Sequence, residues 1–336
     1  AEAPAVALEK TVDEANKIGH NLRFGKSYAS AKAYWHKLGP GLTTGAADDD
    51  PSGIGTYSQA GAANGFSLLW LALFTFPLMA IIQEMCARIG LVTGRGLAAN
   101  IRSHFPPWML YSTTIMLFAA NTFNIGADLG AMATASQLLR PEIPFAALVI
   151  FFTVLSLTLQ IFVQYQKYDH YLKWLALVLL VYIFSALSVR LDWGLIFHST
   201  VIPDINFSKN ELILICAILG TTISPYLFFW QSSQEVEEEI LDGKTTVAMR
   251  QTETSSSDIK NMRIDVWTGM FVSNLVMFFI IAASAATLNA YGVTNIDTAA
   301  DAAQALRPIA GESAYFLFTL GIIGTGLLAV PILAGS

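Results

Sequence analysis

The chain has 336 residues, of which 54% are hydrophobic and 13% charged, and its formal net charge is -6. Such a composition is typical of a membrane protein with several spans and excludes an ordinary soluble domain. The mildly acidic balance also excludes nucleic acid as an expected partner, because phosphate backbones attract basic surfaces.

Residues 1–37 are polar and predict a cytosolic N-terminal tail. Residues 38–336 predict a transmembrane transport domain, because they hold eight apolar segments near the ~20 residues that cross a lipid bilayer. These segments cover 38–62, 67–89, 107–137, 143–165, 170–189, 211–238, 264–289 and 313–334. Most of the 19 Lys and Arg residues lie in the tail and in alternate loops, which predicts a cytoplasmic N-terminus. We expect a bacterial inner membrane, since the sequence has no targeting feature.

Three consecutive acids, Asp48, Asp49 and Asp50, precede Pro51 near the middle of the first segment. A charge at the bilayer centre costs at least about 2.5 kcal/mol on insertion scales, so intramembrane acids usually mark an ion or proton pathway. Proline breaks a helix and frees carbonyl oxygens at the same point. Together these features indicate a cation site. The alternative, that an Asp caps the second half of the broken helix, explains one acid better than three.

The sixth segment is also interrupted, by Thr221–Pro225. Two interrupted helices are typical of an inverted-repeat transporter with its site at the membrane midplane. Five helices separate the breaks, so a complete pair of repeats needs ten helices, and this chain supplies eight. We predict an all-α fold with a first repeat over about 38–189 and a partial second repeat over about 211–336.

Both breaks offer hard oxygen ligands, which suit Mg2+, Ca2+ or Mn2+. The oxygens expected to bind the ion belong to Asp50 and Ala47 in the first break and to Thr221 and Ser224 in the second. The ion is a transported substrate, and no cofactor is expected.

Several motifs of the chain resemble the NRAMP metal-ion transporters. The run Gly39–Gly41 followed by Asp50–Pro51 is similar to the first helix of that family, with its DPGN motif. The stretch Gln83–Leu97 is similar to the end of the second helix, and Thr221–Pro225 stands where the family has Met–Pro–His. The resemblance covers roughly 38–334 and implies a LeuT-like fold, with helices one and six unwound at a shared midplane site.

The chain departs from the family at two ligand positions. The family's Asp is kept as Asp50, but its Asn position is Gly53 and its Met position is Ser224. A thioether favours transition metals, and Mg2+ keeps several waters and fits a roomier oxygen-lined site. This pattern resembles the NRAMP-related magnesium transporters, so the sequence predicts Mg2+ as the main cargo, with Mn2+ possible. Asp48 and Asp49 are expected to add negative potential.

Proton coupling looks weakened in this chain. Where coupled family members have histidines in helix six, this sequence has Tyr226 and Gln231, which do not titrate near neutral pH. The acidic pattern of helix three appears as Asn124–Ala127, with Asp128 one residue later. We therefore predict uncoupled, downhill transport by alternating access, with Asp128 as an accessory acid.

Other functions are weighed against this prediction. A proton-coupled Mn2+ or Fe2+ transporter would use Asp128 or the three consecutive acids as proton acceptors. An amino-acid transporter is disfavoured because those acids would repel a substrate carboxylate, and no motif of an enzyme is present. Glu84 is expected to pair with Arg88 one turn on. The polar stretch from Lys244 to Ser257 is expected to be a flexible loop.

Overall fold

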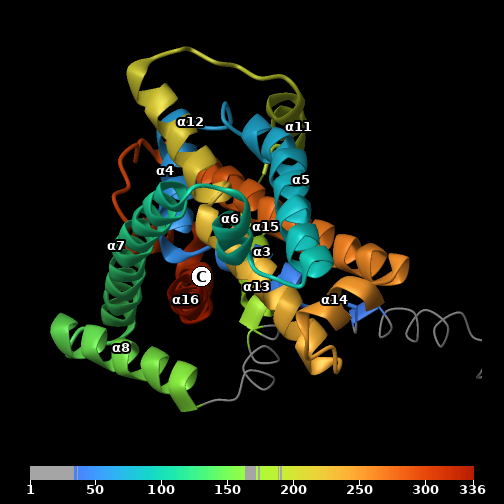
Figure 1. The fold of residues 1–336 in the computed structure, drawn as a ribbon. Coiled ribbons are helices and arrows are strands. Elements are labelled where there is room, and N and C mark those ends of the chain that lie inside the picture. Colours follow the sequence, from blue (N-terminus) through green and yellow to red (C-terminus); the bar gives the residue numbers. More distant parts are fainter. Residues whose placement is uncertain (1–33, 36, 163–171, 173–174, 188, 190) are drawn as a thin grey trace, which may run out of the picture. The chain divides into compact units, whose positions relative to one another are not determined.

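The computed structural model describes residues 34–35, 37–162, 172, 175–187, 189 and 191–336. The chain divides into two compact units, Ala1–Gly39 and Pro40–Ser336, and the second holds the predicted transport domain (Figure 1). Within the described residues every regular element is a helix. Most of the predicted tail lies outside the described residues.

The predicted spans correspond to helices of the second unit. The first five predicted segments are α3 (Pro40–Asp48) with α4 (Pro51–Asn64), α5 (Trp70–Thr93), α7 (Pro107–Leu139), α8 (Phe145–Phe162), and η1 (Ala176–Leu179) with α10 (Leu180–Leu187). The last three are α12 (Lys209–Thr222) with α13 (Pro225–Leu241), α15 (Ser256–Thr287) and α16 (Ala299–Gly335). Shorter elements connect them: α6 (Leu97–His104), α11 (Trp193–Val201), α14 (Val247–Glu253) and η2 (Asn289–Tyr291).

Five of the described helical stretches are long and apolar enough to cross a membrane: Trp70–Thr93, Phe145–Phe162, Lys209–Leu241, Ser256–Tyr291 and Gly311–Gly335. Large apolar side chains are exposed on the outer helices, including Phe118 and Phe123 of α7 and Phe151 and Phe162 of α8. Exposed apolar faces of this extent mark an interaction site, and on long helices lipid is the natural partner.

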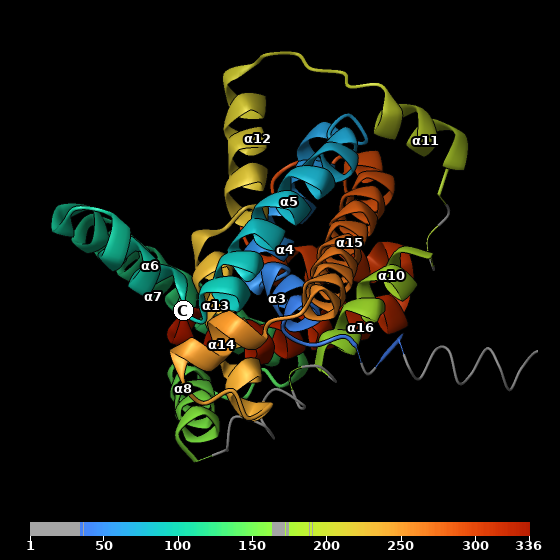
Figure 2. The ribbon, with the colours of Figure 1, turned by 45° about the vertical axis from the view of Figure 1, so that its right-hand side comes forward.

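Helix α15 is the central support of the transport domain. It packs along α3, α4 and α5, while α16 packs against α7 and α4 (Figure 2). The contact with α3 is close because glycines face each other: a side-chain carbon added at Gly269 would lie 1.9 Å from the Gly41 carbonyl oxygen. Small residues at such crossings let two helix backbones approach, as in many membrane bundles.

One expectation for the connecting segments is wrong. The stretch from Lys244 to Ser257 contains the helix α14 and is anchored to the bundle. Arg250 is buried, and its guanidinium donates to the carbonyl oxygens of Gly94, Lys244 and Thr245. Composition alone suggested flexibility, but the contact with Gly94, which is 156 positions away, and the two local contacts hold the segment in place.

The α3–α15 crossing makes a testable prediction for stability. Gly269→Ala forces the two helices apart, and overpacking of this kind costs about 1–3 kcal/mol. The melting temperature of the purified protein should fall by several degrees. Gly126→Ala on α7 is the matched control, since nothing lies within 4 Å of the added carbon. Equal melting temperatures for the two variants would show that α15 does not support α3 in this way.

Candidate metal-ion site

The first helix break lies between Asp48, the last residue of α3, and Pro51, the first of α4. Asp50 is the N-cap of α4, with an extended backbone (φ -67, ψ 165). Its Oδ1 accepts from the Gly53 amide at 2.6 Å and from the Ser52 hydroxyl at 2.7 Å. The capping alternative therefore holds for this one acid. Both bonds use Oδ1, so Oδ2 is the oxygen that could bind an ion.

The second break lies between Thr222, which ends α12, and Pro225, which begins α13. The break frees backbone carbonyl oxygens from helical hydrogen bonds, and a side chain of the same segment bonds two of them. The Ser224 hydroxyl donates to the Gly220 and Thr221 carbonyl oxygens, at 3.0 and 2.8 Å. Two of the predicted ligands, the Ser224 hydroxyl and the Thr221 carbonyl, thus bond to each other.

The fold brings the two breaks together, as the sequence predicts. A side-chain carbon at Gly53 would lie 3.1 Å from Thr221 Oγ1, so α4 and the end of α12 nearly touch. The Tyr226 hydroxyl donates to the Ala47 carbonyl at 2.9 Å and joins α13 to α3. The Ala47 carbonyl, a predicted ion ligand, therefore already accepts a hydrogen bond. The role of Tyr226 in joining the two broken helices was not predicted from the sequence.

Four carboxyl groups are buried around the breaks: Asp48, Asp49, Asp50 and Asp128 are each at most 2% exposed. Asp48 Oδ2 accepts from the Ser273 hydroxyl at 2.8 Å, but Asp48 Oδ1 and both oxygens of Asp49 and Asp128 have no hydrogen-bond partner among the described residues. None of the ion pairs between described residues includes any of the four. Buried carboxylates without a cation are strongly disfavoured.

The four acids do not form a cage. Among the described residues, no three Asp, Glu, His or Cys side chains converge closely enough to hold a metal ion. Asp128 of α7 lies within electrostatic range of Asp50, whereas Asp48 turns toward α15. An ion at the breaks would therefore need carbonyl, hydroxyl or water oxygens in addition to carboxylates.

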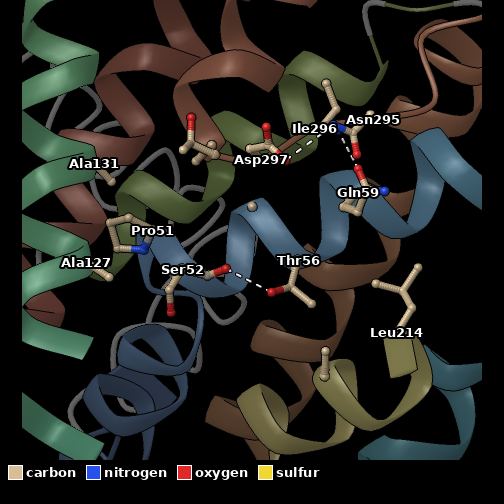
Figure 3. Close-up of a pocket in the computed structure, with 14 residues that line it drawn as sticks. Pro51, Ser52, Thr56, Gln59, Ala127, Ala131, Leu214, Asn295, Ile296 and Asp297 are labelled. Atoms are coloured by element: carbon tan, nitrogen blue, oxygen red, sulfur yellow. Dashed lines mark hydrogen bonds between the residues drawn. The ribbon is translucent and has the colours of Figure 1, made fainter. Parts of the chain in front are cut away.

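A cavity of about 420 Å3 reaches the first break (Figure 3). Pro51 and Ser52 line it beside the break, and Gln59 lines it farther along α4. Asn295 and Asp297 line it from the segment that precedes α16. Ser52, Thr56 and Gln59 recur at helical spacing, so α4 turns one polar stripe toward the cavity. The Ser52 hydroxyl, which binds Asp50, connects the cavity to the buried acids.

Other buried hydrogen bonds hold the helices around the breaks. The Asp265 carboxylate of α15 accepts from the Gly41 and Leu42 amides, at 2.6 and 3.1 Å, and so caps α3. Gln83 of α5 donates to the Leu227 carbonyl, and Gln231 donates to Glu235 within α13. The accessory residue Gln231 is thus buried and hydrogen-bonded within α13.

Glu84 also has the structural role that the sequence predicts. Its carboxylate pairs with Arg88 one turn on and with Arg263 of α15, at 2.8 Å, and accepts from the Trp267 indole. These contacts fasten α5 to α15.

The chain matches the family described as natural resistance-associated macrophage protein-like (Nramp) over residues 41–336. It is 26% identical over 319 residues to the divalent metal cation transporter MntH of Pectobacterium carotovorum, covering 92% of this chain and 73% of the relative. The MntH of Yersinia pestis is 27% identical over 318 residues, covering 89% and 71%.

Solved structures match the same region. The manganese transporter of Eremococcus coleocola, in complex with an aromatic bis-isothiourea substituted compound, superimposes with a TM-score of 0.70 at 17% identity. The match covers 90% of this chain and 65% of that one, so the chain spans about two thirds of the length of this structure. The fold is thus LeuT-like, with α3–α4 as helix one and α12–α13 as helix six.

The buried acids make a testable prediction. Asp128→Asn removes an unpartnered charge and should raise the melting temperature of the metal-free protein at pH 8. Asp265→Asn is the matched comparison. Its new amide would face a backbone N–H of α3 in place of an acceptor, which costs about 1–3 kcal/mol. If both variants lost stability, Asp128 would not be an unpartnered, destabilising acid and would not differ in this way from the hydrogen-bonded Asp265.

Proposed function

Since the chain belongs to the Nramp family, we propose that it carries a divalent metal ion across a membrane and binds it where the two helix breaks meet. The observation that carries this proposal is the group of buried acids with no cationic side chain beside them. A divalent cation supplies the missing positive charge. Members of this family are metal-ion transporters, so an enzyme is excluded.

Asp50 is the primary ligand in this proposal. Its Oδ1 holds the start of α4, and Oδ2 binds the ion, so ion binding and helix geometry are linked through one side chain. Asp128 of α7 lies within electrostatic range of Asp50 and adds a second charge. Water completes the shell together with other groups at the same junction: the Ser224 hydroxyl oxygen, the backbone at Gly53, and the carbonyls of Ala47 and Thr221. Each of these two carbonyls accepts one hydrogen bond and keeps a second lone pair for the ion.

Transport follows from the asymmetry between the two sides of the site. The polar cavity along α4 gives the ion access to Ser52 and Asp50, whereas the contacts of Asp265 and Gln83 close the opposite side. Alternating access requires those contacts to break while the cavity closes. With a cytoplasmic N-terminus, as the Lys and Arg distribution predicts, the cavity opens to the outside.

We propose Mn2+ as the favoured cargo, because the relatives are named as divalent metal cation and manganese transporters. Carboxylate, carbonyl and water ligands suit Mn2+ as well as Mg2+. The structure also shows a thioether beside the second break, where Thr222 Oγ1 lies 3.7 Å from Met277 Sδ. Ser224 stands where the family has Met, but the Met277 sulfur still lies near this break.

Mg2+ is the second candidate, and the comparisons do not favour it. Its support is the pair Gly53 and Ser224, whose small side chains suit an ion that keeps its waters. Uncoupled transport also remains a prediction, because Tyr226 and Gln231 hold structural hydrogen bonds and do not titrate near neutral pH. Proton release measured in step with Mn2+ uptake would favour the coupled alternative.

The first test is uptake into proteoliposomes at a fixed inside-negative potential. Asp50→Ala should reduce Mn2+ uptake by at least about 100-fold, the scale expected when a buried charged ligand is lost. Asp192→Ala is the matched control, because Asp192 caps α11 in the same way on an exposed connecting segment. Normal uptake by Asp50→Ala, or an equal loss in the control, would refute Asp50 as the ion ligand.

Selectivity provides a separate test. Ser224→Met restores a soft ligand and should raise the preference for Mn2+ over Mg2+ by about tenfold, or ~1.4 kcal/mol. The measurement is the concentration of Mg2+ that halves Mn2+ uptake. Thr56→Met, elsewhere on the cavity wall, controls for added bulk. An unchanged preference would place position 224 outside the ion's ligand shell.

A further inference from the structure

A cavity of about 650 Å3 lies between the end of α7 and the start of the apolar part of α16, and it shares no lining residue with the cavity along α4. Arg140 lines it from the end of α7, and Arg307, Glu312, Tyr315 and Phe316 line it from α16. Two guanidinium groups and one carboxylate give this cavity a net positive charge, although the whole chain has a formal net charge of -6. The cavity therefore attracts anions, unlike the acidic helix breaks.

The charged groups of this cavity lie where predicted membrane-spanning segments end. Arg140 directly follows α7, and Glu312 directly follows Gly311, where the apolar stretch Gly311–Gly335 begins. Long cationic side chains and tyrosines at such positions place their polar ends at the level of the lipid head groups. In the predicted topology α7 ends and α16 begins on the outer side of the membrane, so the cavity faces the outer leaflet.

Arg307 is held in the cavity by two side chains of its own helix. Its Nε donates to Glu312 Oε1 at 2.8 Å, and its guanidinium carbon lies 5.0 Å from the centre of the Tyr315 ring. The Tyr315 hydroxyl donates to the Leu138 carbonyl oxygen at 2.8 Å, so this group of side chains also ties α16 to α7. The two Nη groups of Arg307, which carry most of its N–H donors, have no hydrogen-bond partner among the described residues.

Arg140 supplies a second cation that no carboxylate neutralises. Its side chain is exposed, and none of the ion pairs between described residues includes it. Because Arg307 and Glu312 cancel each other, the excess charge of the cavity is the single charge of Arg140, which one phosphodiester would balance. Arginine is well shaped for this partner, since its planar group donates two parallel hydrogen bonds to a phosphate.

The apolar surroundings of the cavity suit a hydrocarbon chain. Phe316 lines the cavity and is 49% exposed, and Leu320, one turn farther along α16, is 41% exposed. Residues four positions apart lie on one face of a helix, so these two side chains form an apolar track from the cavity into the membrane-spanning part of α16. A small free anion would leave this track unused.

We propose that this cavity binds an anionic phospholipid. The phosphodiester accepts hydrogen bonds from Arg140 and Arg307, and one acyl chain lies along Phe316 and Leu320. Basic pockets between membrane-spanning helices hold anionic head groups in other proteins. The head group bonds to the ends of both α7 and α16, so the lipid stabilises their contact. This inference goes beyond the proposed function, since it involves neither helix break nor the transported ion.

The probe is phosphatidylglycerol, added in mixed micelles to the purified full-length protein, and the measured quantity is the melting temperature. It should rise with the mole fraction of phosphatidylglycerol and saturate, whereas phosphatidylcholine with the same acyl chains should have little effect. Arg140→Gln should raise the mole fraction for half of the rise by about tenfold, the usual scale for one lost hydrogen bond to a charged group. Lys209→Gln is the matched control, because it removes an exposed cation on the same predicted side that does not line the cavity.

Glu312→Gln separates lipid binding from a purely structural ion pair. Loss of the carboxylate frees Arg307 for the phosphate and should lower the mole fraction for half of the rise by about threefold, the scale of one exposed ion pair. A purely structural pair would instead lower the melting temperature without lipid and leave that mole fraction unchanged. An unchanged mole fraction in Arg140→Gln or in Glu312→Gln would overturn the proposal, as would equal stabilisation by phosphatidylcholine. The same rise with glycerol phosphate, which has no acyl chains, would show a site for small anions and overturn the assignment to a lipid.

Discussion

Every polar backbone group of a membrane-spanning segment must find a hydrogen-bond partner inside the protein. The groups that lack a helical partner are concentrated where the two interrupted helices meet. The chain meets it with side chains from both breaks. Asp50 caps α4, Ser224 covers the freed carbonyls of α12, and Tyr226 covers Ala47 across the gap. These bonds keep the irregular backbone in the interior, and the other features of the site depend on them.

The proposed transport requires the breaks to move without unfolding, and the same bonds are suited to that. Each consists of one or two hydrogen bonds of a single side chain rather than an extended packing interface, so an ion or water can replace it at little net free energy. Helix α15 offers the contrast, because its glycine crossing with α3 and the Asp265 cap fix one end of the broken helix. A stable support beside an exchangeable junction is what alternating access requires.

Sequence patterns predicted the parts of the site that depend on local chemistry. The first break follows from acids and a proline in an apolar segment, and the second from Thr221–Pro225. The Glu84–Arg88 pair follows from helical spacing. Contacts between distant segments were not predictable in this way. Asp265 reaches a helix start 224 positions away, and Arg250 anchors a stretch whose composition suggested a loop.

The three consecutive acids show most clearly why sequence adjacency differs from a shared site. In a regular helix, neighbouring side chains point about 100° apart, and an interrupted backbone separates them further. Asp48 accepts a hydrogen bond from Ser273 of α15, Asp49 has no hydrogen-bond partner among the described residues, and Asp50 caps the start of its own helix. Their charges still sum at the membrane centre and attract cations over several ångströms, but each carboxylate meets different partners. The three consecutive acids therefore do not form a single metal cage, and of the three only Asp50 is proposed to bind the transported ion.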